Sequence, residues 1–254
     1  VQDADLAVDS SGRVHVVWSA EGILYHRWNA GAGWSSVQAI GAGSQPALAG
    51  DGAGRVYLAF ARNTGTAPDV YLAIWQNGIW GSVLNLSESD NPSVAPAIAA
   101  APSGALVVAW SEEIFADAAW VFAAVSMDGS HWSAGPVGFA EGNCLTAAFD
   151  ADGWPAVAWQ AALGVGQPEE VFFSRWNGVR WEEIEDVSVT LDMPSRRPAL
   201  AWRGDTWVLA WVEGEGSAAR VVASVFDMGS RSWDMPVVLS EETPLGRPAV
   251  VYRP

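Results

Sequence analysis

Glutamate carboxyl groups cleave glycosidic bonds in many enzymes, and three glutamates of this 254-residue chain are candidates for that chemistry. Glycoside hydrolysis uses two carboxyl groups about 5 to 10 Å apart, one of them kept protonated by a raised pKa. The sequence offers Glu112 or Glu113 paired with Glu213, since these residues follow apolar runs that end in tryptophan. The other interpretation is that all three are ordinary solvated charges in exposed loops. The residues alone leave both interpretations open.

Three arginines occupy a second recurring position, just before a proline. Arg196 and Arg197 precede one such proline and Arg247 precedes another. Guanidinium groups donate hydrogen bonds and carboxylates accept them, so a rim that carries both suits a polyhydroxylated sugar. Trp120, which follows a long loop, would add an aromatic face for such a ligand. The alternative is a solvated rim whose charges pair with one another.

The sequence predicts neither a metal site nor a cofactor. Its three histidines, His15, His26 and His131, lie in different strands or turns and lack the spacing of metal ligands. The single cysteine, Cys144, excludes an intrachain disulfide and a thiolate metal cluster. Because Cys144 enters an apolar run, we expect a buried structural thiol.

The elements that must position these residues come from one phrase repeated about every 50 residues. The phrase begins Pro-Ala-Leu-Ala, continues through an Asp-x-x-Gly turn into an apolar run that ends in an aromatic residue, and closes with a Trp-x-x-Gly-x-Trp hairpin. The aromatics that end the runs are Trp18, Phe60, Trp110, Trp159 and Trp211, and the hairpin tryptophans are Trp34, Trp80, Trp132, Trp181 and Trp233. Two independent markers therefore keep the same period.

We expect four antiparallel strands in each repeat. The run 55–61 is apolar at nearly every position, which is typical of a strand buried on both faces, and Asn77-Gly78 is a strong hairpin signal. Repeats of this length and content are typical of β-propeller blades. The sequence therefore predicts an all-β fold in which residues 1–254 form a single five-bladed propeller, with repeats at 1–45, 46–95, 96–145, 146–197 and 198–247.

The predicted ring is closed by the N- and C-terminal segments. Residues 3–9 have the pattern of the innermost strand of the first blade, and residues 248–254 have that same pattern again. Both copies cannot occupy one place. The terminal copy closes the ring, the chain is part of a longer array, or the surplus strand mediates self-association with another chain.

The third hairpin connects the repeat to a known family. Ser126-Met-Asp128-Gly129-Ser-His-Trp132 resembles the Asp box, Ser-x-Asp-x-Gly-x-x-Trp, of sialidase-like bacterial β-propeller repeats (also called BNR repeats), and is one residue shorter. The resemblance covers nearly the whole chain at the level of the blade pattern. It implies a propeller fold, secretion and a sialidase-like activity, and it gives the Asp box itself the role of locking a hairpin.

Composition limits the partners. The net charge of -16 and the absence of any basic stripe exclude a nucleic-acid partner and argue against anionic membranes. No apolar stretch approaches the roughly 20 residues that a membrane-spanning helix needs. Most of the 16 tryptophans occupy repeated positions, which favours packing between blades over ligand stacking. The lysine-free, tryptophan-rich composition favours an extracellular or cell-surface location.

These observations favour a non-catalytic recognition module that binds a glycan or a protein partner through its loop face. The predicted ligand-binding residues are Arg196, Arg197, Arg247, Glu112, Glu113, Glu213 and Trp120. Two other functions stay open. One is a sialidase-like glycoside-cleaving enzyme that uses the acidic rim, and the other is a structural or assembly module of a larger surface protein.

Overall fold

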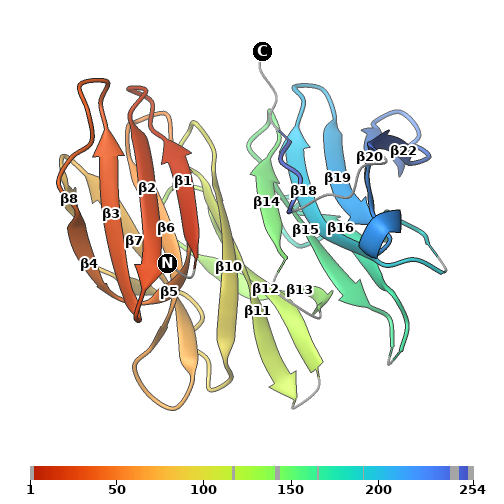
Figure 1. Cartoon of the computed structure of the whole chain (residues 1–254), viewed down its shortest axis with the longest axis horizontal. Coiled ribbons are helices and arrows are strands. Elements are labelled where there is room, and N and C mark those ends of the chain that lie inside the picture. Colours follow the sequence, from red (N-terminus) through yellow and green to blue (C-terminus); the bar gives the residue numbers. More distant parts are fainter. Residues whose placement is uncertain are drawn as a thin grey trace. The chain divides into compact units, whose positions relative to one another are not determined.

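The computed structural model is an all-β protein built from five antiparallel sheets (Figure 1). It describes residues 3–115, 118–140, 144–164, 166–190, 192–240 and 246–250. These residues contain one short 3₁₀ turn, η1 (Gly216–Ala218), and no helix long and apolar enough to cross a membrane. The chain divides into two compact units, Val1–Pro136 and Val137–Pro254.

Each repeat supplies one sheet, and the sheets are numbered here in chain order. Sheet 1 contains β1 (Ala4–Val8), β2 (Val14–Ala20), β3 (Ile23–Asn29) and β4 (Gln38–Ala42). Sheet 2 contains β5 (Ser44–Gly50), β6 (Val56–Asn63), β7 (Pro68–Gln76), β8 (Ile79–Trp80) and β9 (Leu84–Asn85). Sheet 3 contains β10 (Ser93–Ala100), β11 (Leu106–Phe115), β12 (Ala118–Ser126) and β13 (Ser133–Ala140).

The second unit holds sheets 4 and 5. Sheet 4 contains β14 (Thr146–Phe149), β15 (Pro155–Ala162), β16 (Glu169–Arg175) and β17 (Glu185–Asp186). Sheet 5 contains β18 (Ser195–Trp202), β19 (Trp207–Glu213), β20 (Arg220–Asp227), β21 (Ser232–Trp233) and β22 (Val237–Ser240). The first four strands of each sheet pair consecutively and antiparallel, while β9 pairs with β7 and β22 pairs with β20. This confirms the predicted antiparallel repeat and adds a fifth short strand to sheets 2 and 5. Residues 248–250 of the predicted closing strand belong to no strand, and residues 251–254 lie outside the described residues.

The core lies between neighbouring sheets. One buried cluster joins sheets 1 and 2, a second joins sheets 2 and 3, and a third joins sheets 4 and 5. Phe60, Trp110, Trp159 and Trp211, which end the apolar runs, are all at most 2% exposed. Burial of a large apolar side chain stabilises a fold by about 1.5 to 3 kcal/mol, so these residues hold neighbouring sheets together. The predicted burial is confirmed for these four residues, whereas Trp18 at the equivalent position is half-buried and the hairpin residue Trp34 is 48% exposed.

A bulge interrupts the first strand of three sheets at equivalent places. Gln45, Ala95 and Arg197 each have a left-handed backbone, with φ of 52°, 53° and 58°, and each directly precedes proline. The pairing register shifts at all three positions. Proline has no N–H to donate to the ladder, so the bulge falls where a ladder hydrogen bond is already missing.

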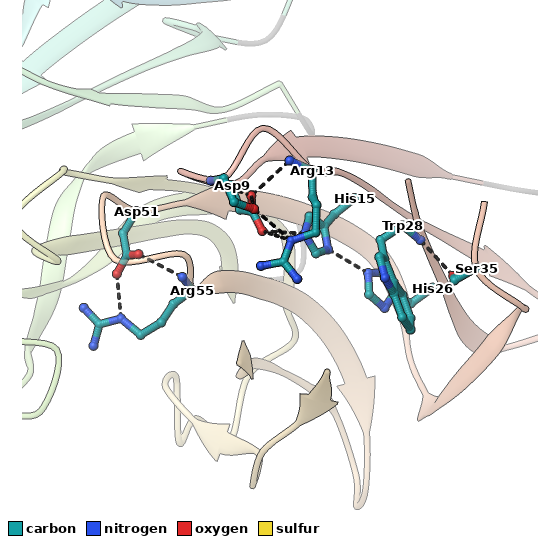
Figure 2. A network of polar contacts seen from close by, with 9 residues as sticks. Asp9, Arg13, His15, His26, Trp28, Ser35, Asp51 and Arg55 are labelled. Atoms are coloured by element: carbon teal, nitrogen blue, oxygen red, sulfur yellow. Dashed lines mark hydrogen bonds and ion pairs between the residues drawn. The ribbon is translucent and has the colours of Figure 1, made fainter. Parts of the chain in front are cut away.

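Short aspartate-capped turns join the first two strands of a sheet. Asp51 Oδ1 accepts the backbone N–H groups of Ala53 and Arg55, and Asp51 Oδ2 accepts the Arg55 guanidinium (Figure 2). Gly54 completes the turn with a φ of +78°, a conformation that favours glycine. These contacts explain why the Asp-x-x-Gly phrase recurs between the strands.

Sheets 1 and 2 are also joined by a buried polar chain, and Figure 2 shows its part within sheet 1, from Asp9 through His15 to His26. Trp80 Nε1 donates to His26 Nδ1 at 3.3 Å, His26 Nε2 lies 3.1 Å from His15 Nδ1, and His15 Nε2 lies 3.2 Å from Asp9 Oδ2. An indole N–H can only donate, so His26 Nδ1 must accept. His26 therefore donates from Nε2 to His15, and His15 donates from Nε2 to Asp9. All three hydrogen bonds of this polar chain therefore point the same way, from Trp80 toward Asp9, and both imidazoles are neutral.

This environment sets the titration of the three groups. Burial lowers the pKa of His26 to about 4, and burial also lowers the pKa of His15. For Asp9, burial alone would raise the pKa, but hydrogen bonds from Ser11, Arg13 and His15 outweigh it and lower the pKa to about 2. The chain is therefore stable with neutral histidines and an ionised aspartate.

The histidine chain predicts a loss of stability in mild acid. A histidine whose pKa is lower when folded than when unfolded contributes stability above the unfolded value of about 6.5, and that contribution is lost as the pH falls toward the folded value. Between pH 7 and pH 4.5 the free energy of unfolding is expected to fall by about 2 kcal/mol from these groups. Urea titrations at several pH values measure it. The variant His131→Gln removes an exposed histidine whose pKa is raised by its hydrogen bond to Asp128, so it should show a decline at least as steep. A flat profile in the parent protein would contradict the assignment.

The bulge gives a second prediction, because left-handed backbone strains every residue except glycine. Ala95→Gly is expected to raise the free energy of unfolding or leave it unchanged. Ala97→Gly, in extended backbone of the same strand, is expected to lower it by about 1 kcal/mol. Thermal or urea unfolding of the matched pair measures the difference. Equal destabilisation by both variants would show that the conformation at Ala95 carries no strain.

Candidate functional site

Glu112 is a buried hydrogen-bond acceptor at one end of sheet 3. Its side chain is 6% exposed. Ser89 Oγ donates to Oε1 at 2.8 Å, and Ser93 Oγ and Trp110 Nε1 donate to Oε2 at 3.3 and 3.1 Å. Ser93 lies opposite Glu112 in the strand register. Glu112 therefore ties the connection that leaves sheet 2 to the first strand of sheet 3.

A second buried glutamate, Glu170 in sheet 4, plays the same part and was not predicted from the sequence. Its carboxylate accepts hydrogen bonds from the hydroxyls of Ser188 and Thr190, and from the Thr190 N–H at 3.2 Å. Burial raises the pKa of Glu170, while these hydrogen bonds oppose the shift. In sheet 2 the corresponding acid is Asp69, which Ser87 and Ser89 bind. The sequence signal for these two acids is a Ser-x-Ser/Thr phrase that follows the third strand, at residues 87–89 and 188–190.

Glu113 and Trp120 lie beside Glu112 but face solvent. Glu113 is exposed and its backbone N–H donates to the Pro92 carbonyl at 3.0 Å. Trp120 is 42% exposed and lies opposite Glu112 in the pairing of β11 with β12. Its position in the strand corresponds to that of Asp69 and Glu170. Sheet 3 thus presents an indole where sheets 2 and 4 hold a hydrogen-bonded carboxylate.

In the second unit the predicted charges form ion pairs. Arg196 bridges Glu169 at 2.7 Å and Glu215 at 2.8 Å, and the hydrogen bond from its side chain to Glu169 raises the pKa of Arg196. Glu213 is 4% exposed and accepts a hydrogen bond from Arg220 Nε at 2.7 Å. The Arg196 and Glu213 side chains are therefore engaged with their own unit.

The other two arginines differ in what they offer a ligand. Arg197 is exposed, and its left-handed backbone is fixed by a hydrogen bond from its N–H to Gln160 Oε1 at 2.8 Å. Arg247 donates from Nε to the Pro198 carbonyl at 2.7 Å and from Nη2 to the Leu145 carbonyl at 2.6 Å. Arg247 thus fastens its segment to the first strands of sheets 4 and 5.

The geometry separates the predicted residues into two kinds. Glu112 is buried with three donors, and Glu213 is buried with the Arg220 guanidinium on Oε2, so each acts as a structural tie in its own unit. Glu113, Trp120 and Arg197 are exposed, at the equivalent end of sheets 3 and 5. Among the described residues, no group of three or more His, Cys, Asp or Glu side chains is arranged to hold a metal ion.

Comparison with known proteins identifies a shared fold. No protein-family model matches the chain, and no curated protein matches it. A Hadza microbial sialidase superposes with a TM-score of 0.61 at 14% identity, covering 97% of this chain and 60% of the sialidase. The chain thus spans about three fifths of that enzyme's length.

Two further solved structures bind saccharides. An ulvan lyase, a polysaccharide lyase bound to a glucuronic-acid-containing saccharide, has a TM-score of 0.61 at 14% identity, over 92% of this chain and 69% of the lyase. Aleuria aurantia lectin, in complex with alpha-methyl-L-fucoside, has a TM-score of 0.55 at 15% identity, over 96% of this chain and 79% of the lectin. At these identities the chain is similar to a sialidase, a lyase and a lectin in fold.

Proposed function

We propose that this chain is a non-catalytic recognition module, a five-bladed β-propeller closed by its terminal segments, that binds a glycan on its loop face. The observation that carries the proposal is that the predicted site residues divide into buried ones and exposed ones. The acids suited to cleave a glycoside, Glu112 and Glu213, are buried ties, while Arg197, Glu113 and Trp120 are exposed at strand ends. The similarity in fold to a lectin and to two carbohydrate-active enzymes supports a glycan over a protein as the partner.

Each unit offers exposed groups that suit a sugar. In the first unit Glu113 accepts hydrogen bonds from hydroxyl groups and the Trp120 ring offers a flat apolar face, and in the second unit Arg197 donates to hydroxyl groups. Arg196 and Arg247, whose guanidinium groups are already hydrogen-bonded, support the rim rather than bind directly. In this proposal the module acts outside the cell or at its surface, as part of a secreted bacterial protein with sialidase-like repeats.

The buried-tie role of Glu112 predicts a large effect on stability. Glu112→Ala leaves two buried donors, Ser93 and Trp110, and the half-buried Ser89 without this acceptor, and is expected to lower the free energy of unfolding by about 2 to 4 kcal/mol. The neighbouring Glu113→Ala removes an exposed carboxylate and is expected to change it by less than about 0.5 kcal/mol. Urea unfolding of both variants provides the comparison. A Glu112→Ala protein as stable as Glu113→Ala would return Glu112 to the list of candidate catalytic groups.

Binding to a broad glycan array tests the recognition role. We expect saturable binding that Arg197→Ala and Trp120→Ala each weaken at least tenfold, with their unfolding midpoints unchanged. The matched control is Arg203→Ala, which removes an exposed arginine paired with Asp205 elsewhere in sheet 5. Release of a sugar from any arrayed glycoside, abolished by Glu112→Gln or Glu213→Gln, would instead favour the glycoside-cleaving function.

A further inference from the structure

A groove runs along the second unit at the C-terminal end of β16. The other end of β16 lies beside the rim residue Arg196. β16 begins at Glu169, which pairs with Arg196, and ends at Arg175 in the groove, a separation of about 20 Å along the strand. The main hollow has a volume of about 740 Å³. It is lined chiefly by Arg175, Arg180, Trp181, Glu182, Glu185 and Arg231.

A second hollow of about 320 Å³ adjoins the first and shares Arg175, Asn177, Glu182 and Arg231 with it. It adds Asp150, Trp154 and Trp176. The combined groove is therefore formed by the turn before β15 and by the hairpins that follow β16 and β20. Volumes of 300 to 1,000 Å³ are usual for small-molecule sites.

The floor of the groove is rigid. Arg175 Nε donates to Glu182, and the Arg175 guanidinium lies 5.2 Å from the centre of the Phe226 ring. Glu182 Oε1 also lies 3.5 Å from Arg231 Nη2, so two arginines share one carboxylate and the three groups together keep one positive charge. The Asn177 side chain is fixed because its Oδ1 accepts the N–H groups of Val179 and Arg180, both at 3.1 Å.

Two polar groups in the groove do not contribute hydrogen bonds to the described part of the fold. The Arg180 guanidinium and the Asn177 amide nitrogen have no hydrogen-bond partner among the described residues, and both residues are exposed. Burial raises the pKa of Glu185, which lies on the same wall. Donors and acceptors thus face the same space. A site with this mixture satisfies hydroxyl groups, which both donate and accept.

Aromatic rings provide the apolar part of the lining. Trp154 is 36% exposed, and its ring lies so close to Gly178 that a Cβ on Gly178 would come within 3.0 Å of it. Trp176 and Trp181 pack edge to face with centroids 5.7 Å apart. These rings are held in place by the hairpin, so they offer preformed surfaces for the apolar face of a sugar ring.

The charges of the groove decide the class of saccharide. Arg175 and Arg231 are occupied by Glu182, which leaves Arg180 as the guanidinium without a partner among the described groove residues. Against it stand the carboxyl groups of Asp150, Asp152, Glu183 and Glu185. A groove with this acidic excess repels a sulfated or carboxylated ligand and accepts a neutral one.

From this arrangement we propose that the groove of sheets 4 and 5 is a second saccharide site, selective for neutral oligosaccharides. Trp154 and Trp181 stack on sugar rings, and Arg180 and Asn177 donate to hydroxyls. The site extends the proposed recognition function, but it shares no residue with the rim. A module with two such sites would hold one branched or repeating glycan at two points.

Isothermal titration with neutral oligosaccharides chosen from an array tests the groove. We expect saturable binding that Arg180→Ala and Trp154→Ala each weaken at least tenfold, while Arg197→Ala on the rim and the control Arg203→Ala leave it within twofold. Tryptophan fluorescence should change on binding in the parent protein, and Trp154→Phe should reduce that change. Unfolding midpoints within 2 °C of the parent would show that the variants fold.

The outcomes separate the groove from the rim. Neutral-sugar binding lost in Arg197→Ala and kept in Arg180→Ala would overturn the groove and leave the proposed rim function intact. Binding confined to sialylated, sulfated or uronic-acid glycans would overturn the selectivity argued from charge. No binding to any neutral saccharide would overturn the groove site, whereas loss in the groove variants alone would establish it and leave the rim to be judged by the array glycans whose binding Arg197→Ala weakens.

Discussion

Every sheet of this protein depends on being covered by its neighbour. The middle strands are apolar on both faces, as β6 and β11 show, so a single sheet would leave rows of Val, Leu and Trp in water. Packing sheet against sheet removes that surface, and it also fixes where polar chemistry can occur. In the middle strands, side chains that meet solvent or ligand lie at the strand ends and in the adjoining hairpins, which is where the rim and the groove are found. The outer strands, such as β22, expose side chains along their length.

The same constraint explains why so many acids of an acidic chain are unavailable for catalysis. The connections between sheets need buried acceptors for their hydroxyl and N–H groups, and Glu112, Glu170 and Asp69 provide them. A carboxylate with three donors is a strong structural tie and a poor proton carrier. The charges left for recognition are therefore those that no connection needs, such as Arg197 and Arg180.

The strands can be predicted well from the sequence because two patterns mark them in each repeat. Apolar runs mark the strands themselves, and turn residues mark their ends. The sequence also predicts the burial of Trp110, Trp159 and Trp211. It does not predict that Glu112 is buried, because the partners Ser89 and Ser93 come from the preceding connection and are brought near only by the packing of the sheets. The groove is missed for a related reason. Trp176 and Trp181 occupy the repeated hairpin positions, whose recurrence indicates scaffold, and no periodicity marks that two hairpins and the turn that carries Trp154 converge.

The directional chain from Trp80 through His26 and His15 to Asp9 has a consequence for assembly order. Repeats that resemble one another are able to pair out of sequence during folding, since an apolar face accepts almost any other apolar face. The junction of sheets 1 and 2 is different, because an indole donor on one side must meet an imidazole acceptor on the other. A hairpin tryptophan recurs in every repeat, so the donor is common, whereas the buried imidazole acceptor comes from sheet 1. A neighbour packed on sheet 1 without its indole in reach would leave His26 Nδ1 buried and unsatisfied, so the polar chain fixes how a hairpin must dock on sheet 1.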